Sequence, residues 1–508
     1  MDYQAFVDGR KTLLVSPAGY GKTHTIAECL KYTSGKQLIL THTHAGVASI
    51  KEKIKAQGIP SSKYSVETIS GFAQRYVRAF YVGVEFPSHD DQGFHAFIIN
   101  KAREVFSAPI VQQVIATSYQ GLLVDEYQDC TKPQHAMNME LSKVLPIHIL
   151  GDPLQGIFDF NDEPINFETD LADFEEFPEL TTPWRWTQNG NTENLGRIIK
   201  GYRERLIKPQ PIEVADSRGN GLRVYVNDQF DLDNRSSPYW ELLQKWIKNE
   251  RNQESLESLL IIIPEYVGDK RRRGDIIDRT NVAKQIDFSN SVSLLEAIDS
   301  KDYYLAARAV DDLSKAQKPT KAQKPIKKIY DLASKFFLKS SPKNSSNVGL
   351  NDWLSKPPKG QRGDWRIIDK TGANKQFSDK LKNVFDSYIS DASLKNLHDI
   401  LLFLQNTLKL RRQRRRELYN ALINAIEQAL LDRTSVYEAM VVQKNRVRRA
   451  GRKIYGKCIG TTLLTKGLEF DTVVILDAHK FQCPKHLYVA LSRCCKNLII
   501  FTAKTTLP

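Results

Sequence analysis

The stretch that decides the fold is Leu13-Leu-Val-Ser-Pro-Ala-Gly-Tyr-Gly-Lys-Thr-His-Thr-Ile-Ala27. Three apolar residues lead into a glycine-bearing turn, and helical spacing begins at Lys22-Thr23. Gly19 and Gly21 allow backbone angles that a side chain disfavours, so successive N–H groups can point toward a phosphate at the N-terminus of the helix. This order of strand, loop and helix predicts a phosphate-binding loop.

Two side chains of this loop indicate a nucleoside triphosphate and a magnesium ion. Lys22 is expected to reach the β- and γ-phosphates, and the Thr23 hydroxyl is expected to be a ligand of Mg²⁺. Ser16 stands where the pattern G-x-x-x-x-G-K-[ST] has its first glycine. The alternative is a glycine-rich turn that binds no ligand.

A second apolar strand delivers adjacent carboxylates, in Gly121-Leu-Leu-Val-Asp-Glu-Tyr-Gln-Asp129. Asp125 is expected to hold Mg²⁺ through water, and Glu126 is expected to activate the water that attacks the phosphate. Adjacent acids at the end of a buried strand are costly unless a cation or hydrogen bonds compensate for them. That cost disfavours a purely structural role.

Further apolar runs alternate with segments of helical spacing on both sides of a long central region. The alternation predicts an α/β fold with two parallel sheets flanked by helices. The expected strands lie within 37–44, 65–68, 147–160, 257–263, 458–464, 472–476 and 498–501.

Length and composition limit the class of protein. A chain of 508 residues is expected to divide into roughly three or four domains. The apolar runs are far shorter than the roughly 20 residues that span a bilayer, and the N-terminus shows no export signal. We therefore expect no membrane partner and a cytoplasmic location. The six cysteines have no C-x-x-C pair, so they are interpreted as free thiols, with a redox or metal role as the alternative.

The positive charge is concentrated in two segments. The formal net charge is +14, while residues 301–345 hold 11 Lys and Arg against 4 Asp, and residues 401–457 hold 14 against 4 acids. Together, these two segments carry a larger net positive charge than the whole chain does. A polyanion such as a nucleic acid would therefore be drawn to them first. The alternative is a pair of solvated lysine- and arginine-rich surfaces.

The chain is predicted to have four parts. They are a first α/β domain (1–76 and 116–179), a short first insertion (77–115), a second α/β domain (180–265 and 455–508) and a basic, largely helical insertion (266–454).

The ordered motifs resemble those of superfamily 1 helicases of the UvrD/Rep type, over most of 1–200 and 455–508. The resemblance rests on Ala18-Gly-Tyr-Gly-Lys-Thr23 (Walker A), Thr41-His-Thr-His-Ala45 (motif Ia), Thr68-Ile-Ser-Gly-Phe72, Asp125-Glu-Tyr-Gln-Asp129 (Walker B), Gly151-Asp-Pro-Leu-Gln-Gly-Ile-Phe158 (motif III), Pro183-Trp-Arg185, Lys466-Gly-Leu-Glu-Phe470 (motif V) and Tyr488-Val-Ala-Leu-Ser-Arg493 (motif VI). It implies two RecA-like P-loop NTPase domains, with 77–115 as a reduced 1B insertion and 266–454 as a 2B-like insertion.

The resemblance also implies roles for single residues. Gln155 would sense the γ-phosphate, and Arg185 and Arg493 would reach it from opposite sides, so these three join Glu126 as catalytic residues. Trp184 would stack on the adenine. The implied nucleotide contacts are Gln4, Ala18, Gly19, Tyr20, Gly21, Lys22, Thr23, His24, Trp184, Gly467 and Glu469, and the implied metal ligands are Thr23 and Asp125.

The implied DNA contacts depart from the family pattern at several positions. They are Thr41, His42, Thr43, Phe72, Phe158 and Phe160, of which His42 replaces a base-stacking Phe, and Phe158 and Phe160 replace a Tyr and a Trp. Leu463 stands at the customary histidine of motif V. Stacking is worth about 1–3 kcal/mol per base, so these changes are expected to weaken the grip on DNA without affecting ATP hydrolysis.

The resemblance implies an ATP-dependent DNA helicase that uses ATP and Mg²⁺ to move 3′ to 5′ on single-stranded DNA and to unwind duplex, in repair or antiviral defence. Single-stranded or partly duplex DNA is the expected partner. A second reading remains open, a DNA-sensing ATPase that controls a partner nuclease with little unwinding. The size and the motifs resemble the short UvrD-like subunits of Gabija-type antiviral systems.

Overall fold

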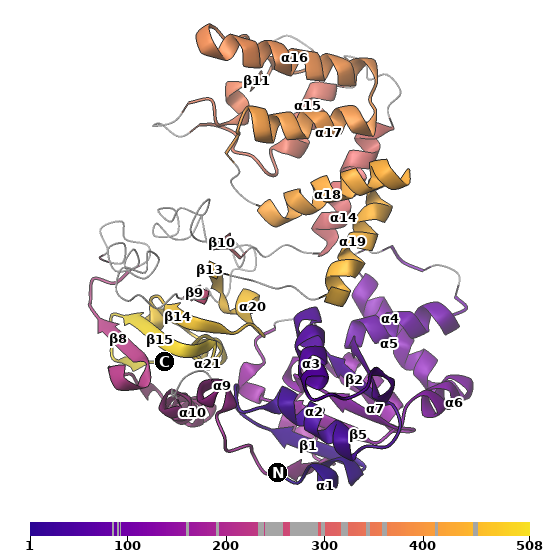
Figure 1. The fold of residues 1–508 in the computed structure, drawn as a ribbon, viewed down its shortest axis with the longest axis vertical. Helices are drawn as coiled ribbons and strands as arrows, with labels where there is room; N and C mark the ends of the chain where they lie inside the picture. The colour runs from indigo at the N-terminus through magenta and orange to yellow at the C-terminus, as the bar shows by residue number, and fades with distance from the viewer. Residues whose placement is uncertain are drawn as a thin grey trace. The chain divides into compact units, whose positions relative to one another are not determined.

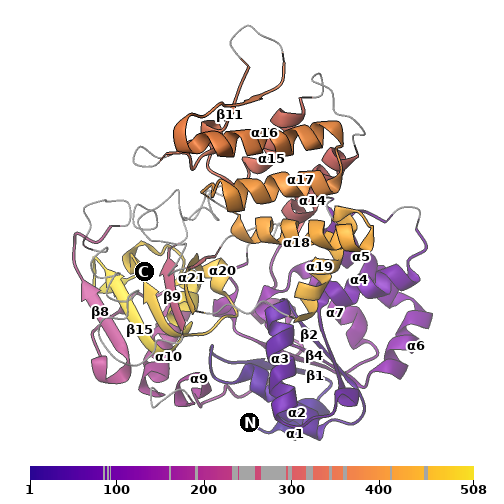
Figure 2. The ribbon, with the colours of Figure 1, turned by 45° about the horizontal axis from the view of Figure 1, so that its top comes forward.

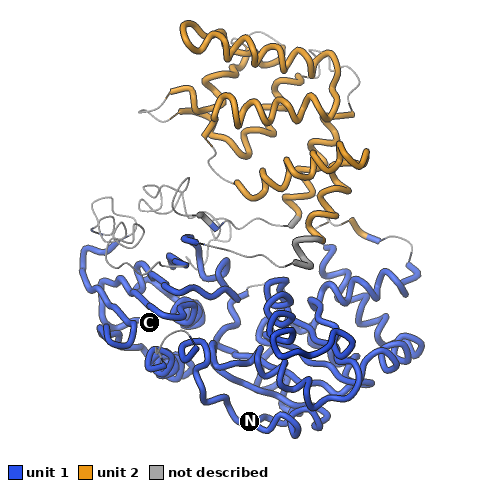
Figure 3. The backbone as a smooth tube through the Cα atoms, in the orientation of Figure 1, with its two compact units in different colours: residues 1–86, 93–297, 448–508 blue, residues 87–92, 298–447 orange. Residues whose placement is uncertain are grey.

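The structure is a computed structural model that describes residues 1–83, 86–88, 91, 93–158, 162–188, 193–231, 238, 258–264, 293–295, 300–315, 324–341, 346–357, 363–411, 415–450 and 456–508. The chain divides into two compact units. The first unit comprises residues 1–86, 93–297 and 448–508, and the second comprises residues 87–92 and 298–447 (Figure 3).

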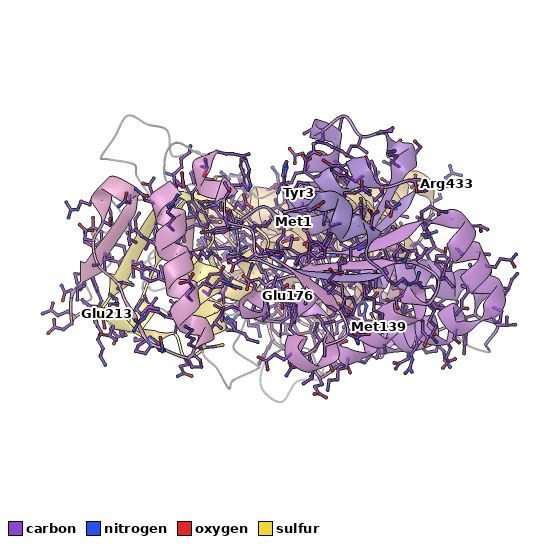
Figure 4. The ribbon with its side chains drawn as sticks, turned by 90° about the horizontal axis from the view of Figure 1, so that it is seen from below. Met1, Tyr3, Met139, Glu176, Glu213 and Arg433 are labelled. Carbon is purple, nitrogen blue, oxygen red and sulfur yellow. The ribbon has the colours of Figure 1, made fainter. Side chains whose placement is uncertain are left out.

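The first unit contains two six-stranded parallel sheets, which confirms the predicted α/β fold class. We call the part built on the first sheet, up to Phe177, the first lobe, and the rest of this unit the second lobe. Glu176 lies on the first sheet's edge strand and Glu213 lies in the second lobe (Figure 4).

The first sheet gathers the phosphate loop and the predicted acids at one edge. Its spatial order is β3(Tyr64–Thr68), β2(Gln37–Thr41), β4(Gly121–Val124), β5(Ile147–Gly151), β1(Lys11–Val15) and β6(Glu175–Phe177). Every neighbouring pair is parallel, so the loops that follow β1, β4 and β5 meet at the carboxyl edge of the sheet. In open α/β sheets this edge is where ligands bind.

Helices cover both faces of the first sheet because its buried residues alternate. In β2, Ile39 packs with one group of helices, whereas Leu38 and Leu40 pack with the other. The first group is α1(Tyr3–Asp8), α2(Lys22–Tyr32) and α3(His44–Ala56), and the second is α4(Ile69–Phe80), α5(Phe94–Ser107), α6(Pro109–Ser118) and α7(Lys132–Ser142), with the short α8(Phe167–Asp170) following β5.

The segment 77–115, expected as an irregular insertion, is helical over most of its described length. Ile98, Phe106 and Ile115 are buried in the same cluster as the strands of the first sheet. Helices α5 and α6 therefore contribute to the core of the first lobe.

The second sheet combines strands from both sides of the central insertion. Its order is β10(Ser293–Leu294), β13(Gly456–Thr461), β9(Ser258–Ile263), β14(Phe470–Ile475), β15(Cys494–Thr502) and β8(Leu222–Val226), all in parallel pairs. In Figures 1 and 2 the magenta β8 lies beside the yellow β15, although more than half of the chain separates them. Strand β10 lies inside the range 266–454, so the boundary of the insertion differs from the one expected.

Four helices of the second lobe supply its contacts with the first lobe and its own core. They are α9(Trp184–Thr187), α10(Glu193–Ile207), α20(Thr462–Thr465) and α21(Pro484–Leu491), and the ladder β7(Ile212–Glu213)–β16(Thr506–Leu507) lies near them. Ala18 and Tyr20 share an apolar cluster with Trp186 and Tyr488. The Ala18 backbone N–H also donates to the Tyr488 hydroxyl at 2.9 Å, so the phosphate loop itself joins the two lobes.

The second unit has a core of its own, formed only by residues of its helices and short connections. Its helices are α14(Ser300–Ser314), α15(Pro325–Ala333), α16(Lys375–Ser390), α17(Leu394–Leu402), the π-helical turn η8(Phe403–Thr407), α18(Arg416–Asp432) and α19(Val436–Ala450), with a small ladder β11(Leu354–Ser355)–β12(Arg366–Ile367). Figure 3 shows this unit in orange. Across the described parts of the chain, every helix is too short or too polar to cross a membrane.

Candidate active site

A cleft of about 430 Å³ runs along the carboxyl edge of the first sheet and is closed by residues of the second lobe. The predicted residues that line it are Ala18, Gly19, Gly21, Lys22, Thr23, His24, Thr41, His42, Thr43, Asp125, Glu126, Gln155, Phe158, Trp184, Arg185, Gly467, Glu469 and Arg493. Segments from seven separate motifs therefore meet in one place.

The phosphate loop has the backbone that its glycines were expected to allow. Gly19 and Gly21 have φ of 78° and 102°, which only glycine adopts without strain. A Cβ on Gly19 would lie 2.7 Å from the Trp186 ring, and one on Gly21 would lie 2.8 Å from Trp184 Cδ1. The second lobe thus packs directly on the loop, so neither glycine could carry a side chain.

Lys22 is bound to the loop that it is expected to serve. Its ammonium donates to the backbone carbonyls of Ser16 at 2.6 Å and Pro17 at 3.1 Å. Burial lowers the pKa of Lys22, and the nearby carboxylates of Asp152 and Glu126 oppose that shift. A phosphate in the cleft would exchange these two neutral acceptors for a charged one.

Of the two strand-end acids, Asp125 is buried and Glu126 is half-buried, and they differ in their affinity for a proton. Burial and the charge of Glu126 raise the pKa of Asp125 to about 7. Burial also acts to raise the pKa of Glu126, but the charges of Lys22 and Lys466 lower it overall. Thr23 Oγ1 lies 3.4 Å from Asp125 Oδ2, so the hydroxyl and the carboxylate form an oxygen donor set that suits Mg²⁺.

Gln128, which the sequence analysis did not single out, holds Glu126 in place. Its Nε2 donates to Glu126 Oε2, and its Oε1 accepts from the backbone N–H of Asp152 at 2.9 Å. Glu126 itself has φ of 57°, an uncommon conformation for a residue with a side chain. The Gln128 amide therefore fixes the carboxylate of a residue, Glu126, whose backbone conformation is itself uncommon.

Lys466 connects motif V to the first lobe. Its ammonium donates to the Asp129 carboxylate and to the Gln155 backbone carbonyl, the latter at 2.5 Å. It also lies 4.6 Å from the centre of the Phe158 ring. Burial raises the pKa of Asp129 to about 7 despite this cation.

Arg493 and Arg185 enter the cleft from the second lobe. Arg493 Nη2 donates to Gln155 Oε1 at 3.1 Å, and burial lowers its pKa to about 10. Arg185 Nη2 donates to Glu469 Oε1 at 2.6 Å. The charge of Arg185 is the largest cause of the low pKa of Glu469, about 2.

A buried ion pair extends this network to α10. Arg203 Nη2 lies 2.9 Å from Asp152 Oδ1, and both side chains are at most 5% exposed. Asp152 Oδ2 in turn accepts from Gln155 Nε2 at 3.2 Å. The polar chain Arg203–Asp152–Gln155–Arg493 thus begins and ends in the second lobe and passes through the first. Arg203 lies in no motif, and its only sequence signal is a charged residue among the apolar positions of an amphipathic helix.

Of the predicted residues that the structure describes, three do not line the cleft: Gln4, Tyr20 and Phe72. Gln4 lies on α1, where its amide donates to both Asp8 carboxylate oxygens at 2.8 Å. Tyr20 is 1% exposed at the junction of the lobes. Phe160 lies outside the described residues.

Phe72 corrects one of the DNA contacts implied by the resemblance. Its ring is 0% exposed and packs against Tyr76 and Phe106, with ring centres 4.8 Å and 5.6 Å away. A side chain in the core of the first lobe cannot stack on a base. The helical spacing of Ile69, Phe72, Ala73, Tyr76 and Val77, all buried, is the signal that identifies a core face.

His42 also has a protein partner. Its Nε2 lies 3.3 Å from the Cys130 sulfur. Burial and the charge of Lys466 lower the pKa of His42 to about 3, so the ring is neutral at physiological pH. The Thr43 hydroxyl caps α3 by accepting from the Gly46 N–H at 3.0 Å.

The second half of the first lobe matches a known family model. Residues 85–174 match the model of the UvrD/REP helicase N-terminal domain. This match supports a helicase of the UvrD type. It contains Asp125, Glu126, Gln128 and Gln155, whereas the phosphate loop lies before it.

The other two comparisons add little. No curated protein matches the sequence. The helicase nonstructural protein 10 of an arterivirus, solved with DNA, is 16% identical, with a TM-score of 0.25 over 45% of this chain and 46% of that one. The PRRSV helicase is also 16% identical, with a TM-score of 0.25 over 53% of this chain and 43% of that one. This chain thus spans less than half of either helicase, and TM-scores this low carry no argument.

Proposed function

We propose that this protein is an ATP hydrolase that couples hydrolysis to 3′-to-5′ movement on single-stranded DNA. The observation that carries the proposal is the meeting of a phosphate loop, two strand-end carboxylates and two arginines of the opposite lobe in one cleft. The match to the UvrD/REP helicase N-terminal domain supports the same function.

Each group in the cleft has a role in hydrolysis. Lys22 and the N–H groups of the phosphate loop would bind the phosphates, and Trp184 would contact the base. Thr23 and Asp125 would hold Mg²⁺, which offsets phosphate charge when bound. Glu126, oriented by Gln128, would accept a proton from the attacking water. Arg185 and Arg493 would stabilise the charge that develops on the γ-phosphate.

Gln155 would connect hydrolysis to movement. Lys466 donates to the backbone carbonyl of Gln155, and Arg493 donates to its side-chain oxygen. The second lobe therefore contacts this first-lobe residue at two points. A change in the occupancy of the γ-phosphate site would alter these contacts and the angle between the lobes. Repeated closure and opening would then move the DNA strand.

The first experiment measures ATP hydrolysis with and without single-stranded DNA. We expect DNA-stimulated turnover in the native protein. Glu126→Gln should bind ATP but hydrolyse it roughly 10²- to 10⁴-fold more slowly, whereas Lys22→Ala should bind ATP weakly. Native turnover in Glu126→Gln would contradict the proposal. Unwinding of duplexes with a single 3′ or 5′ tail then reports the direction of movement.

The second candidate is a DNA-sensing ATPase that controls a partner nuclease, as in Gabija-type antiviral systems. The burial of Phe72 and the contact of His42 with Cys130 favour it, because two of the side chains expected to contact DNA are in contact with the protein instead. Stimulation of hydrolysis by DNA without strand separation, together with co-purification of a nuclease encoded by a neighbouring gene, would support this candidate.

A further inference from the structure

The base of a bound nucleotide has a defined place in the cleft. Trp184 lies against Gly21 of the phosphate loop, and its ring centre is 6.1 Å from that of His24. That distance is a direct ring contact, so a base that enters must part the two rings or lie beside them. Trp184 is 42% exposed and is free to move more readily than a core side chain.

The glutamine that the resemblance implies as the adenine reader is elsewhere. The Gln4 amide is bonded to Asp8 on its own helix, and Gln4 does not line the cleft. Another residue must contact the edge of the base if this site distinguishes adenine from other bases.

Gln57, which follows α3, lines the cleft together with His24 and Trp184. Its Nε2 donates to Glu28 Oε1 at 2.8 Å and lies 3.3 Å from His24 Nδ1. His24 Nε2 lies 3.3 Å from the same carboxylate oxygen. The Gln57 amide nitrogen thus lies between the Glu28 carboxylate, to which it donates, and the His24 ring.

These contacts fix the orientation of the Gln57 amide. A rotation that exchanged its oxygen and nitrogen would place the oxygen against the Glu28 carboxylate, where two acceptors repel. The Gln57 Oε1 atom is buried and has no hydrogen-bond partner. A buried carbonyl without a donor is unfavourable, so Gln57, which lines the cleft, carries an acceptor that the protein orients and does not satisfy.

We propose that Gln57 selects adenine in this cleft, with Oε1 accepting a hydrogen bond from the exocyclic N6 amine of the base. Adenine presents a donor at that position, whereas guanine presents the O6 acceptor. A guanine base would leave two oxygens facing each other. This inference rests on the proposed ATP hydrolase function and adds the residue that determines its nucleotide.

The first test uses the native protein and three nucleotides: ATP, GTP and purine riboside triphosphate, which lacks the exocyclic amine. We expect kcat/KM for the last two to be lower than for ATP by roughly 10- to 100-fold, the cost of leaving a buried acceptor unpaired. Equal values for ATP and purine riboside triphosphate would overturn the proposal. Absence of hydrolysis with all three would contradict the proposed function instead.

The second test uses Gln57→Met, with Gln4→Met as the matched control. Gln57→Met should lower the ratio of kcat/KM for ATP over purine riboside triphosphate to near one. Gln4→Met should leave the ratio unchanged. A native ratio in Gln57→Met, or its loss in Gln4→Met, would overturn the proposal. The nucleotide comparison in the native protein remains decisive if Gln57→Met folds poorly.

Discussion

The two lobes that form the cleft treat buried charge in opposite ways. The first lobe buries acids close to one another, and burial raises the pKa values of Asp125 and Asp129 to about 7. The second lobe buries cations, and burial lowers the pKa of Arg493 to about 10. Buried charge is costly without a partner. Each lobe therefore supplies part of the counter-charge that the other needs, and the contacts of Lys466 with Asp129 and of Arg203 with Asp152 join them.

Removing a second-lobe cation from the reacting phosphate is expected to have the largest effect. Arg493→Ala should lower kcat by roughly 10³- to 10⁵-fold, because an arginine that stabilises transition-state charge is worth that much. Binding of ATP should change much less, since Lys22 and the phosphate loop remain. Single-turnover hydrolysis and nucleotide affinity, measured on the same preparation, separate the two effects.

Arg197 on α10 provides the control for this experiment. Its side chain is 69% exposed and pairs with Glu193 on the same helix. Arg197→Ala should therefore hydrolyse ATP at the native rate. If Arg493→Ala also did so, Arg493 would not act on the γ-phosphate and the second lobe would serve only to close the cleft.

The sequence predicted the fold class and most of the residues that line the cleft, because both depend on local spacing. A phosphate loop needs its glycines and lysine within a few positions, and a parallel strand places its acids at its carboxyl end. Lys22, Asp125 and Glu126 were found in this way. Arg493 required the order of several motifs.

The remaining residues depend on contacts between distant parts of the chain. Gln128 and Arg203 matter because they meet Asp152, and no spacing rule joins α10 to β5. Gln57 is noticeable only through the three-way contact with Glu28 and His24. Phe72 shows the opposite kind of error. It was predicted to contact DNA because of its place in a motif, although the helical spacing of its apolar neighbours is typical of a buried face.

The ion pair across the lobes is expected to have the next largest effect. Arg203→Met would leave Asp152 buried and uncompensated, which costs roughly 3–5 kcal/mol. We expect thermal unfolding several degrees below that of the native protein, and partial recovery in the double variant Arg203→Met with Asp152→Asn. Arg197→Met, on the same helix, should unfold at the native temperature. A native unfolding temperature for Arg203→Met would mean that the lobes do not depend on this pair.

The most gradual expected effect is a change in how stability depends on pH. In the unfolded chain Asp125 has a pKa of about 3.9, whereas burial raises it to about 7 in the folded protein. Between these values the folded protein binds more protons than the unfolded chain, so its stability falls as pH rises. The loss is at most about 1.4 kcal/mol per pH unit for one group.

Asp125→Asn removes this contribution without altering the shape of the side chain. In the absence of nucleotide and Mg²⁺, the variant should unfold at a higher temperature than the native protein at pH 7.5, and the difference should shrink toward pH 4. Part of the dependence of stability on pH should persist in the variant, because burial also raises the pKa of Asp129 to about 7. Saturating Mg²⁺ and ATP should abolish or reverse the advantage, since the native carboxylate then has a cation to bind. If the two proteins differed in unfolding temperature by the same amount at pH 7.5 and at pH 4, Asp125 would already be ionised in the empty cleft. The first lobe would then compensate the charge of its acids without help from the second.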